Sequence, residues 1–558
     1  MIIKEMQEEK KILISKALPK LTEDLFEEYF ISGKRLNYED VYFSRRKFLS
    51  VFAIVGENSA DYQKLDSIIL DICSEKTWAL PAHVDRSLKG WENTLDLFSS
   101  ETAFALSEII SLHKNHLSPQ TVNTAGSAVM DRVLKPFLNS LWGDYWWENV
   151  PMNWCAVCNS SIGAAAIYLL ENEDEKKKLL DRVIKNLTGY LKAFPSDGCC
   201  KEGLYYFYYA FGHLLMFWDL LEEKTGYKTN WERIEYLNDI FLFPQKCLLS
   251  GGYTLSFSDS NTDGKLRIGV QAMMHKRNKE VFIPENDYGG FACDPCFRYG
   301  LLSRDVRFEK DKTLLAEGSK CKKNNELCFF PRAQWLIMNK YPDQSLAVKG
   351  GDNDEPHNHN DIGSLLWICG DDIILADLGA GEYTKNYFND KTRYTYLCCR
   401  SLGHNVPLIN CLEQTFGKEY QADDFSLIEG GVSMDLKKAY PKDCNINFYI
   451  RRVIMKDNCL KIEDDLSFLK PTQIEENFIS LLSCEKTADS IILYGKTDKY
   501  VMTLSYDGSP ETVKTYINEE KYFDHEGQKA LIYRIGFLIK PCESVLSLKV
   551  LIKKEPLK

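Results

Sequence analysis

The sequence lacks long apolar runs. No stretch of about eighteen consecutive apolar residues occurs, and charged side chains interrupt every short apolar segment among the first thirty residues. A membrane-spanning helix needs about 20 predominantly apolar residues, and a secretory signal needs an apolar core followed by a small-residue cleavage site. We therefore expect a cytoplasmic protein with no membrane span and no export signal.

An excess of positive charge is also missing. The chain has 69 Lys and Arg residues against 80 Asp and Glu residues, which gives a formal net charge of −11. A net negative charge of this size argues against a protein that binds nucleic acid or an anionic membrane through its overall charge. An anionic substrate would instead require a locally basic cleft.

Cysteines are not concentrated in a small scaffold. The 18 cysteines are spread over 558 residues, and a reducing compartment accounts for them as small buried side chains. Cys155-x-x-Cys158 and Cys293-x-x-Cys296 have the spacing of metal half-sites, but neither pair lies near a histidine in the sequence. We interpret both pairs as packing residues.

The spacing of apolar residues differs between the two parts of the chain. Apolar residues recur at helical spacing up to about residue 320, and short strand-like runs separated by Gly, Asp, Asn and Pro follow after about residue 325. Two strand-like pieces, 253–257 and 267–270, predict a small hairpin within the first part. Helices followed by strands indicate separate domains of an α+β chain, here 1–325 and 326–558.

Histidines are scarce except in one region. Three of the nine lie between residues 357 and 404. A hairpin formed by 364–369 and 373–377 would return Asp377 toward His359, and the loop before a strand at 406–409 would deliver His404. Two imidazoles and a carboxylate suit zinc, with water as a fourth ligand, while manganese remains an alternative. On spacing alone, surface-loop residues with turn functions are the favoured interpretation.

This region resembles the heparinase II/III-like polysaccharide lyases. The resemblance rests on an N-H-N-D-x-G segment at 358–363, an Asp after the next hairpin, and an R-S-x-x-H-N segment at 400–405. It continues upstream through 77–83, 153–166 and 197–212. It implies an incomplete α/α toroid followed by a layered antiparallel β-domain. It also implies that His359, Asp377 and His404 hold one divalent metal, usually zinc, in a structural role.

The resemblance further implies an active site. His357 matches a residue near the substrate carboxylate or leaving group, and Asn153 matches the position that binds the uronate carboxylate. Trp154 replaces a histidine of some relatives, so this contact rests on Asn153 or on another group such as Asn159. Counting six residues from Gly203 identifies Tyr209 as the catalytic tyrosine.

Helical spacing leaves the tyrosine assignment open. Tyr206 is the alternative catalytic residue, because it shares a helix face with Tyr209. A packing stripe of tyrosines is the default interpretation of such a run. Some of the tryptophans at 142, 146, 147 and 154, Trp154 above all, are candidates for stacking on sugar rings.

β-Elimination across a uronate explains why these residue types occur together. Hydrogen bonds to the carboxylate stabilise charge that develops when the C5 proton leaves. A tyrosinate can take that proton, and the phenol can protonate O4, if cationic neighbours lower its pKa from about 10. Arg86, Arg393 and Arg400 are candidate neighbours and substrate-binding groups.

The expected partner is an acidic oligo- or polysaccharide: heparan sulfate or heparin, hyaluronate, chondroitin or alginate. The oligomeric state stays open. One alternative function is an α/α-toroid glycoside hydrolase, for which Asp259 and Glu202 are the carboxylates. A second alternative is a non-catalytic glycan-binding protein.

Overall fold

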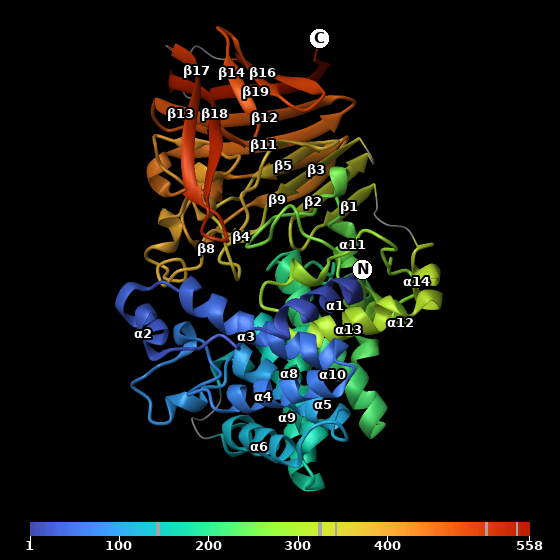
Figure 1. The fold of residues 1–558 in the computed structure, drawn as a ribbon. Coiled ribbons are helices and arrows are strands. Elements are labelled where there is room, and N and C mark those ends of the chain that lie inside the picture. The colour runs from blue at the N-terminus through green and yellow to red at the C-terminus, as the bar shows by residue number, and fades with distance from the viewer. Residues whose placement is uncertain (141–144, 322–325, 341–342, 508–511, 543–544, 558) are drawn as a thin grey trace. The chain divides into compact units, whose positions relative to one another are not determined.

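The computed structural model describes residues 1–558 apart from 141–144, 322–325, 341–342, 508–511, 543–544 and 558 (Figure 1). The chain packs into two compact units. The helical unit comprises Met1–Phe194, Tyr206–Leu242 and Lys265–Lys322, and the sheet unit comprises Pro195–Tyr205, Phe243–Gly264 and Lys323–Lys558. The predicted single division after residue 325 remains a prediction, and residue 325 lies outside the described residues. Two short segments from the first half of the sequence therefore belong to the sheet unit.

The helices are α1 Ile2–Leu13, α2 Glu23–Ser32, α3 Leu36–Val55, α4 Ser59–Cys73, α5 Leu97–Leu112, α6 Pro119–Val129, α7 Lys135–Asn139, α8 Asn153–Leu169, α9 Glu173–Lys192, α10 Leu204–Thr225, α11 Leu237–Lys246, α12 Ile268–Arg277, α13 Tyr299–Glu309 and α14 Lys312–Gly318.

Helices α5 and α8 form the buried centre of the helical unit. Most residues of both helices are buried, so each helix is packed on nearly all sides. Asp96 caps α5 by accepting a hydrogen bond from the Ser99 amide at 2.7 Å. A Cβ at Gly163 of α8 would lie 2.6 Å from the Phe217 ring, so glycine permits the close approach of α8 and α10.

The predicted hairpin at 253–257 and 267–270 is wrong. Arg267 is the N-cap of α12, and the residues after it form its first turn. The segment 253–257 contains only an isolated bridge between Leu248 and Thr254. A short buried apolar run has no periodicity that separates helix from strand, and here packing on all sides selects the helix.

The strands are β1 Leu327–Phe330, β2 Trp335–Lys340, β3 Gln344–Lys349, β4 Asp352–Asn353, β5 Leu365–Cys369, β6 Asp372–Leu375, β7 Leu408–Ile409, β8 Gly417–Gln421, β9 Asp423–Ile428, β10 Gly431–Asp435, β11 Ile446–Lys456, β12 Cys459–Phe468, β13 Thr472–Ser480, β14 Ser483–Lys486, β15 Ser490–Tyr494, β16 Asp498–Asp507, β17 Thr512–Phe523, β18 Lys529–Cys542 and β19 Val545–Pro556.

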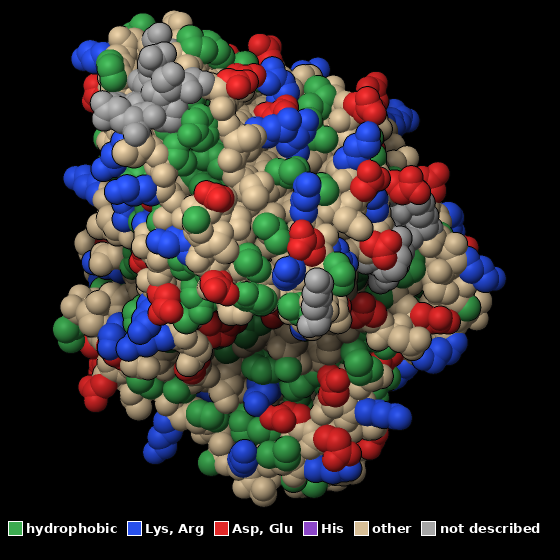
Figure 2. Space-filling model, turned by 90° about the horizontal axis from the view of Figure 1, so that it is seen from above, with side chains coloured by type: hydrophobic (Ala, Val, Ile, Leu, Met, Phe, Trp, Pro, Cys, Tyr) green, Lys and Arg blue, Asp and Glu red, His purple; other side chains and the backbone are tan. Residues whose placement is uncertain are grey.

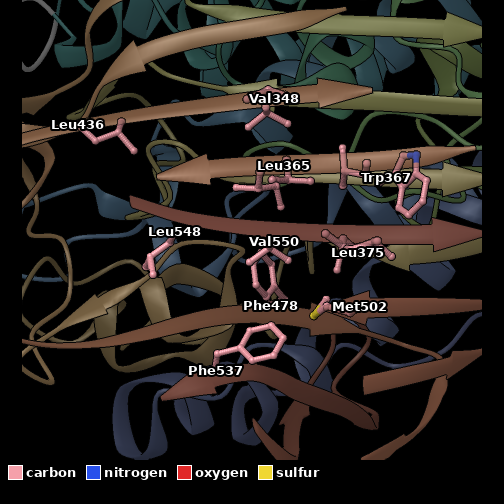
Figure 3. Packing of buried hydrophobic residues seen from close by; sticks show 14 of the residues in the cluster. Val348, Leu365, Trp367, Leu375, Leu436, Phe478, Met502, Phe537, Leu548 and Val550 are labelled. Carbon is pink, nitrogen blue, oxygen red and sulfur yellow. The ribbon is translucent and has the colours of Figure 1, made fainter. Parts of the chain in front are cut away.

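These strands form antiparallel sheets. The first has the order β1-β2-β3-β5-β6, the largest has β14-β15-β16-β19-β12-β11-β10-β9, and smaller sheets have β17-β18-β13-β7 and β4-β8. One apolar core joins the three larger sheets, with Trp367 from the first, Val550 from the largest and Phe537 from the third (Figure 3). Burial alternates along β11, as expected for a strand with one face on the core.

The surface carries charges of both signs. On the face shown in Figure 2, Lys and Arg side chains are interspersed with Asp and Glu rather than gathered into one large basic patch. No helix among the described residues is both long and apolar enough to cross a bilayer.

Candidate active-site residues and metal group

Two of the predicted metal ligands lie together in the sheet unit. His359 and His404 are fully buried, and with Asp361 they form a group whose ligand atoms all lie within 4.8 Å of one another. His359 and Asp361 belong to the segment between β4 and β5, and His404 follows a short helical turn at Ser401–Gly403. Two imidazoles and a carboxylate are a donor set that binds divalent metals.

The Nε2 atom of each imidazole already lies within hydrogen-bond distance of a protein oxygen. His359 Nε2 lies 3.0 Å from Asp259 Oδ1, and His404 Nε2 lies 2.9 Å from the Cys398 carbonyl oxygen. The two Nδ1 atoms and Asp361 Oδ2 are buried without a hydrogen-bond partner among the described residues. Metal-ligating histidines typically donate their other N–H to a carboxylate or carbonyl. The residues therefore fit a divalent cation.

Asp377 lies beside this group. Its Oδ2 is 3.4 Å from His404 Nδ1, and its Oδ1 accepts a hydrogen bond from the Gly379 amide at 3.0 Å. Burial disfavours its charge, but His404 and His359 outweigh burial and keep its pKa below the ordinary value. Asp361 was not among the predicted ligands, although it stands in the quoted N-H-N-D segment. Its Oδ1 accepts from Lys349 Nζ at 2.6 Å, which leaves Oδ2 for another partner.

The hairpin prediction that placed Asp377 is confirmed. Strands β5 and β6 pair antiparallel, so the end of β6 returns toward the segment that carries His359. Asn405 holds this arrangement, because its Nδ2 donates to the carbonyls of Leu365 at 2.6 Å and Ala376 at 2.8 Å.

A buried arginine anchors the two ligand-bearing segments to the large sheet. Arg451 donates to the carbonyl oxygens of Gly363 at 3.1 Å and Asn405 at 2.9 Å. It also binds Asp464 on the neighbouring strand through two nitrogens, at 2.8 and 2.6 Å. These bonds fix the backbone beside His404 and after Asp361.

Asp259 is the centre of a second cluster in the sheet unit. Its fully buried carboxylate lies 2.7 Å from His357 Nδ1 and 3.0 Å from His359 Nε2. It also accepts from Tyr387 at 2.5 Å, Tyr383 at 3.2 Å and Arg393 at 3.2 Å. Burial opposes its charge, but Arg393 and the two imidazoles hold its pKa well below the ordinary value.

His357 occupies a backbone conformation that is uncommon for residues other than glycine. Its φ is 59°, and its Nε2 lies 4.0 Å from Glu202 Oε2. Left-handed conformations at non-glycine residues cluster at functional sites, where surrounding contacts maintain them. The contact with Asp259 is one such constraint.

The three predicted arginines have separate surroundings. Arg393 is buried against Asp259, Arg400 pairs with Glu413 at 3.0 Å, and Arg86 pairs with Glu27 at 2.7 Å on the helical unit. None of these contacts brings an arginine to Tyr209.

Tyr209 lies in the helical unit, buried in α10. Its hydroxyl donates to the Glu101 carboxylate, and the Arg298 guanidinium lies 3.9 Å from the centre of its ring. Burial and the charge of Glu101 raise its pKa well above 10 despite Arg298. Burial likewise raises the pKa of Glu101 to about 7, against the opposing effect of Arg298. Tyr206 is also buried, in the first turn of α10.

The carboxylate-binding candidates begin α8. Asn153 is its first residue and is buried. Asn159 is committed to packing, because its amide donates to the Cys155 carbonyl at 2.8 Å and accepts from Asn186 at 3.0 Å. Trp154 is half-buried, and its ring lies 4.9 Å from that of Trp146, which is 56% exposed. Trp142 lies outside the described residues.

Sequence reasoning missed His83. Its ring meets the Trp154 ring edge to face at 4.7 Å, and its Nδ1 lies 2.8 Å from Asp96 Oδ2. The only signal was its place at the end of the quoted segment 77–83.

Comparison with known proteins places the chain by fold alone. No family model and no curated protein sequence matches it. The structure is similar to heparinase III, with a TM-score of 0.67 and 12% identity over 100% of this chain and 92% of that one. A second heparinase III structure gives 0.62 and 13% over 99% and 90%. The heparan sulfate lyase HepC from Pedobacter heparinus gives 0.59 and 12% over 100% and 88%.

This similarity confirms the predicted fold class. A helical part of the α/α-toroid type precedes antiparallel sheets, as in the heparinase III structures.

Proposed function

We propose that the protein is a polysaccharide lyase that cleaves uronate-containing acidic glycans by β-elimination. The observation that carries the proposal is the pairing of His357 with the buried His359, Asp361 and His404 group through one carboxylate. The whole-length similarity to heparinase III and heparan sulfate lyase supports a glycosaminoglycan as the substrate class.

The elimination requires stabilisation of the charge that develops when C5 loses its proton. We assign the carboxylate contact to Asn153, the first residue of α8, with Trp154 and Trp146 as the surface for a sugar ring. Asn159 is removed from this role, because its amide is used within the helical unit. His83 beside Trp154 is a further candidate for that contact.

Tyr209 can act as the base only after its own proton leaves. Its hydroxyl already donates to Glu101, which makes that carboxylate the acceptor for this proton. Because burial and the charge of Glu101 hold the pKa of Tyr209 well above that of Glu101, this transfer is uphill. Arg298 over the ring stabilises a phenolate. The phenol would then protonate the departing O4. Tyr206 remains the alternative.

We assign His357, in the sheet unit, a contact with the uronate carboxylate or with the leaving oxygen. Asp259 holds the ring of His357 through Nδ1, at 2.7 Å. Arg400, which is partly exposed, is a candidate for binding an anionic sugar. Arg393 is withdrawn from direct substrate binding by its burial against Asp259.

His359 and His404 would hold one divalent cation together with Asp377, Asp361 or both. Zinc fits the two imidazoles best, and manganese fits the oxygen ligands. When bound, the metal supplies positive charge that fixes the segments carrying His357 and His404. We assign it a structural role.

The glycoside hydrolase alternative loses its proposed carboxylate pair. Asp259 is buried and accepts from five side chains, so it cannot face a glycosidic bond as acid or base.

A substrate panel tests the proposal. Heparan sulfate, heparin, hyaluronate, chondroitin and alginate, as polymers and as oligosaccharides, would be incubated with the protein. A lyase produces the ultraviolet absorbance of a 4,5-unsaturated uronate. New reducing ends without this absorbance would indicate a hydrolase, and neither signal with saturable binding would indicate a glycan-binding protein. A His357→Gln variant is the matched inactive control.

A further inference from the structure

We propose that Asp259 is a positioning residue that fixes the protonated nitrogens of His357 and His359 at the same time. For the role of His357 in catalysis the inference rests on the function proposed above. The nitrogens themselves can be examined without any substrate.

The donors around Asp259 decide which atoms carry hydrogen. A guanidinium has no acceptor, and Arg393 is buried against both carboxylate oxygens, at 3.2 and 3.4 Å. The carboxylate is therefore ionised and only accepts hydrogen bonds. Each imidazole nitrogen within 3.0 Å of it must be a donor. Hydrogen thus resides on Nδ1 of His357 and on Nε2 of His359.

The two histidines consequently present opposite nitrogens. His359 keeps a lone pair on Nδ1, which is the buried atom without a hydrogen-bond partner in the metal group. In His357 the lone pair is on Nε2, on the side where Glu202 Oε2 lies 4.0 Å away. A single carboxylate therefore fixes the tautomers of two imidazoles, one of which belongs to the metal group.

The local backbone makes this sharing feasible. His357 and His359 are two residues apart, and the left-handed conformation of His357 turns the chain between them. Arg393 Nε donates to the carbonyl of Asn358, the residue between the two histidines, at 2.9 Å. Arg393 thus holds both the carboxylate and the backbone that carries the two rings.

Nitrogen-15 NMR of protein labelled at histidine tests the inference without mutating Asp259. Signals of His357 and His359 would be assigned by their loss in His357→Gln and His359→Gln. We expect Nδ1 of His357 and Nε2 of His359 to show the shift and proton coupling of protonated nitrogens. An unprotonated Nδ1 at His357, or an unprotonated Nε2 at His359, would overturn the proposal.

The Asp259→Asn variant tests the consequence for the metal. The asparagine side chain has the same shape as aspartate, but one of its two polar atoms is an NH₂ group. This group would face the hydrogen-bond donors around it, so the side chain cannot accept hydrogen bonds from both imidazoles. Zinc affinity, measured by competition with a chromophoric chelator, should fall by roughly 10- to 100-fold. With a uronate substrate, kcat should fall while KM changes less than about threefold.

Asp372→Asn is the matched control. Asp372 is also buried and accepts from Tyr500 at 3.0 Å, but it contacts neither histidine. The zinc affinity of the Asp372→Asn variant should equal that of the parent. Equal zinc affinity in Asp259→Asn and the parent would contradict the proposal.

If Asp259→Asn does not fold, the NMR result on the parent decides. A parent without lyase activity would refute the proposed function while leaving both zinc affinity and nitrogen shifts interpretable.

Discussion

Tyr209 and Tyr206 differ by one helical turn, and substitution of each separates catalysis from packing. Tyr209→Phe removes one oxygen and its bond to Glu101 while keeping the ring. We expect turnover to fall by roughly 10²- to 10⁴-fold, with little change in substrate binding, because positioned acid–base groups contribute about that much. Initial rates of unsaturated product formation measure the effect.

Tyr206→Phe is the control from the same helix face and should retain most of the activity. The reverse result would move the catalytic role to Tyr206. Parent rates in both variants would remove tyrosine from the mechanism.

Glu101 makes stability depend on pH. Its pKa is raised by burial from the ordinary 4.5 to about 7, so the folded state binds more protons than the unfolded state between these values. Its contribution to stability is therefore complete below about pH 4.5 and is lost as pH rises through 7, a change on the order of 3 kcal/mol. Tyr209, Arg298 and His213 face this carboxylate.

Glu101→Gln should abolish that change. Urea unfolding at pH 5 and pH 8 should show the variant gaining stability relative to the parent as pH rises. A difference between the two proteins that stays constant over this range would show that Glu101 titrates normally.

The two carboxylates near His404 can be distinguished by isosteric amides. Asp377→Asn and Asp361→Asn each replace a carboxylate with one oxygen that lacks a hydrogen-bond partner among the described residues. The variant at a true ligand should lose zinc affinity by at least about tenfold, whereas the other should retain it. Elemental analysis and chelator competition measure this directly. Parent affinity in both variants would leave no carboxylate ligand and refute the predicted site.

Local sequence signals identified these residues unevenly. His359 and His404 stood out because histidine is scarce and their motifs are distinctive. Asp259 could not be linked to His357 from sequence, because 98 residues separate them and only folding brings them together. Arg393 was expected to lower the pKa of a tyrosine base, but charge compensation buries it against Asp259 instead.

At the scale of elements, strands β11 and β12 support the proposed metal group through Arg451. Arg451→Met should destabilise the protein by about 3–5 kcal/mol, because it leaves the Asp464 carboxylate buried without its partner. It also removes the donors to Gly363 and Asn405, so zinc affinity should fall. Chemical denaturation and metal analysis measure the two effects.

Arg452 provides the control on the same strand. It pairs with Asp465 and is 36% exposed, so Arg452→Met should cost no more than about 1 kcal/mol. Equal losses in both variants would contradict the stabilising role assigned to the buried Arg451.

Element types were more predictable than their assembly. Short apolar runs separated by turn residues predicted strands after residue 325, and the turn between two such runs predicted the β5–β6 hairpin, because strands and tight turns leave local signatures. The residues at 267–270 were misassigned because complete burial removes periodicity. The inclusion of 195–205 and 243–264 in the sheet unit has no local signature, since it depends on contacts distant in sequence.

At the scale of the whole molecule, the proposed metal lies entirely within one compact unit, so its removal should act unequally on the chain. A ligand at 100 times its Kd stabilises the folded state by about 2.7 kcal/mol. Chelation should therefore lower the unfolding temperature of the sheet unit and leave that of the helical unit nearly unchanged. Calorimetry, with tryptic fragments identified by mass spectrometry, assigns each transition.

The His359→Ala variant is the control, and it should already show the lowered unfolding temperature of the sheet unit and respond no further to chelator. A chelator effect of equal size in parent and His359→Ala would place the stabilising metal elsewhere, and the structural role assigned to this group would be wrong.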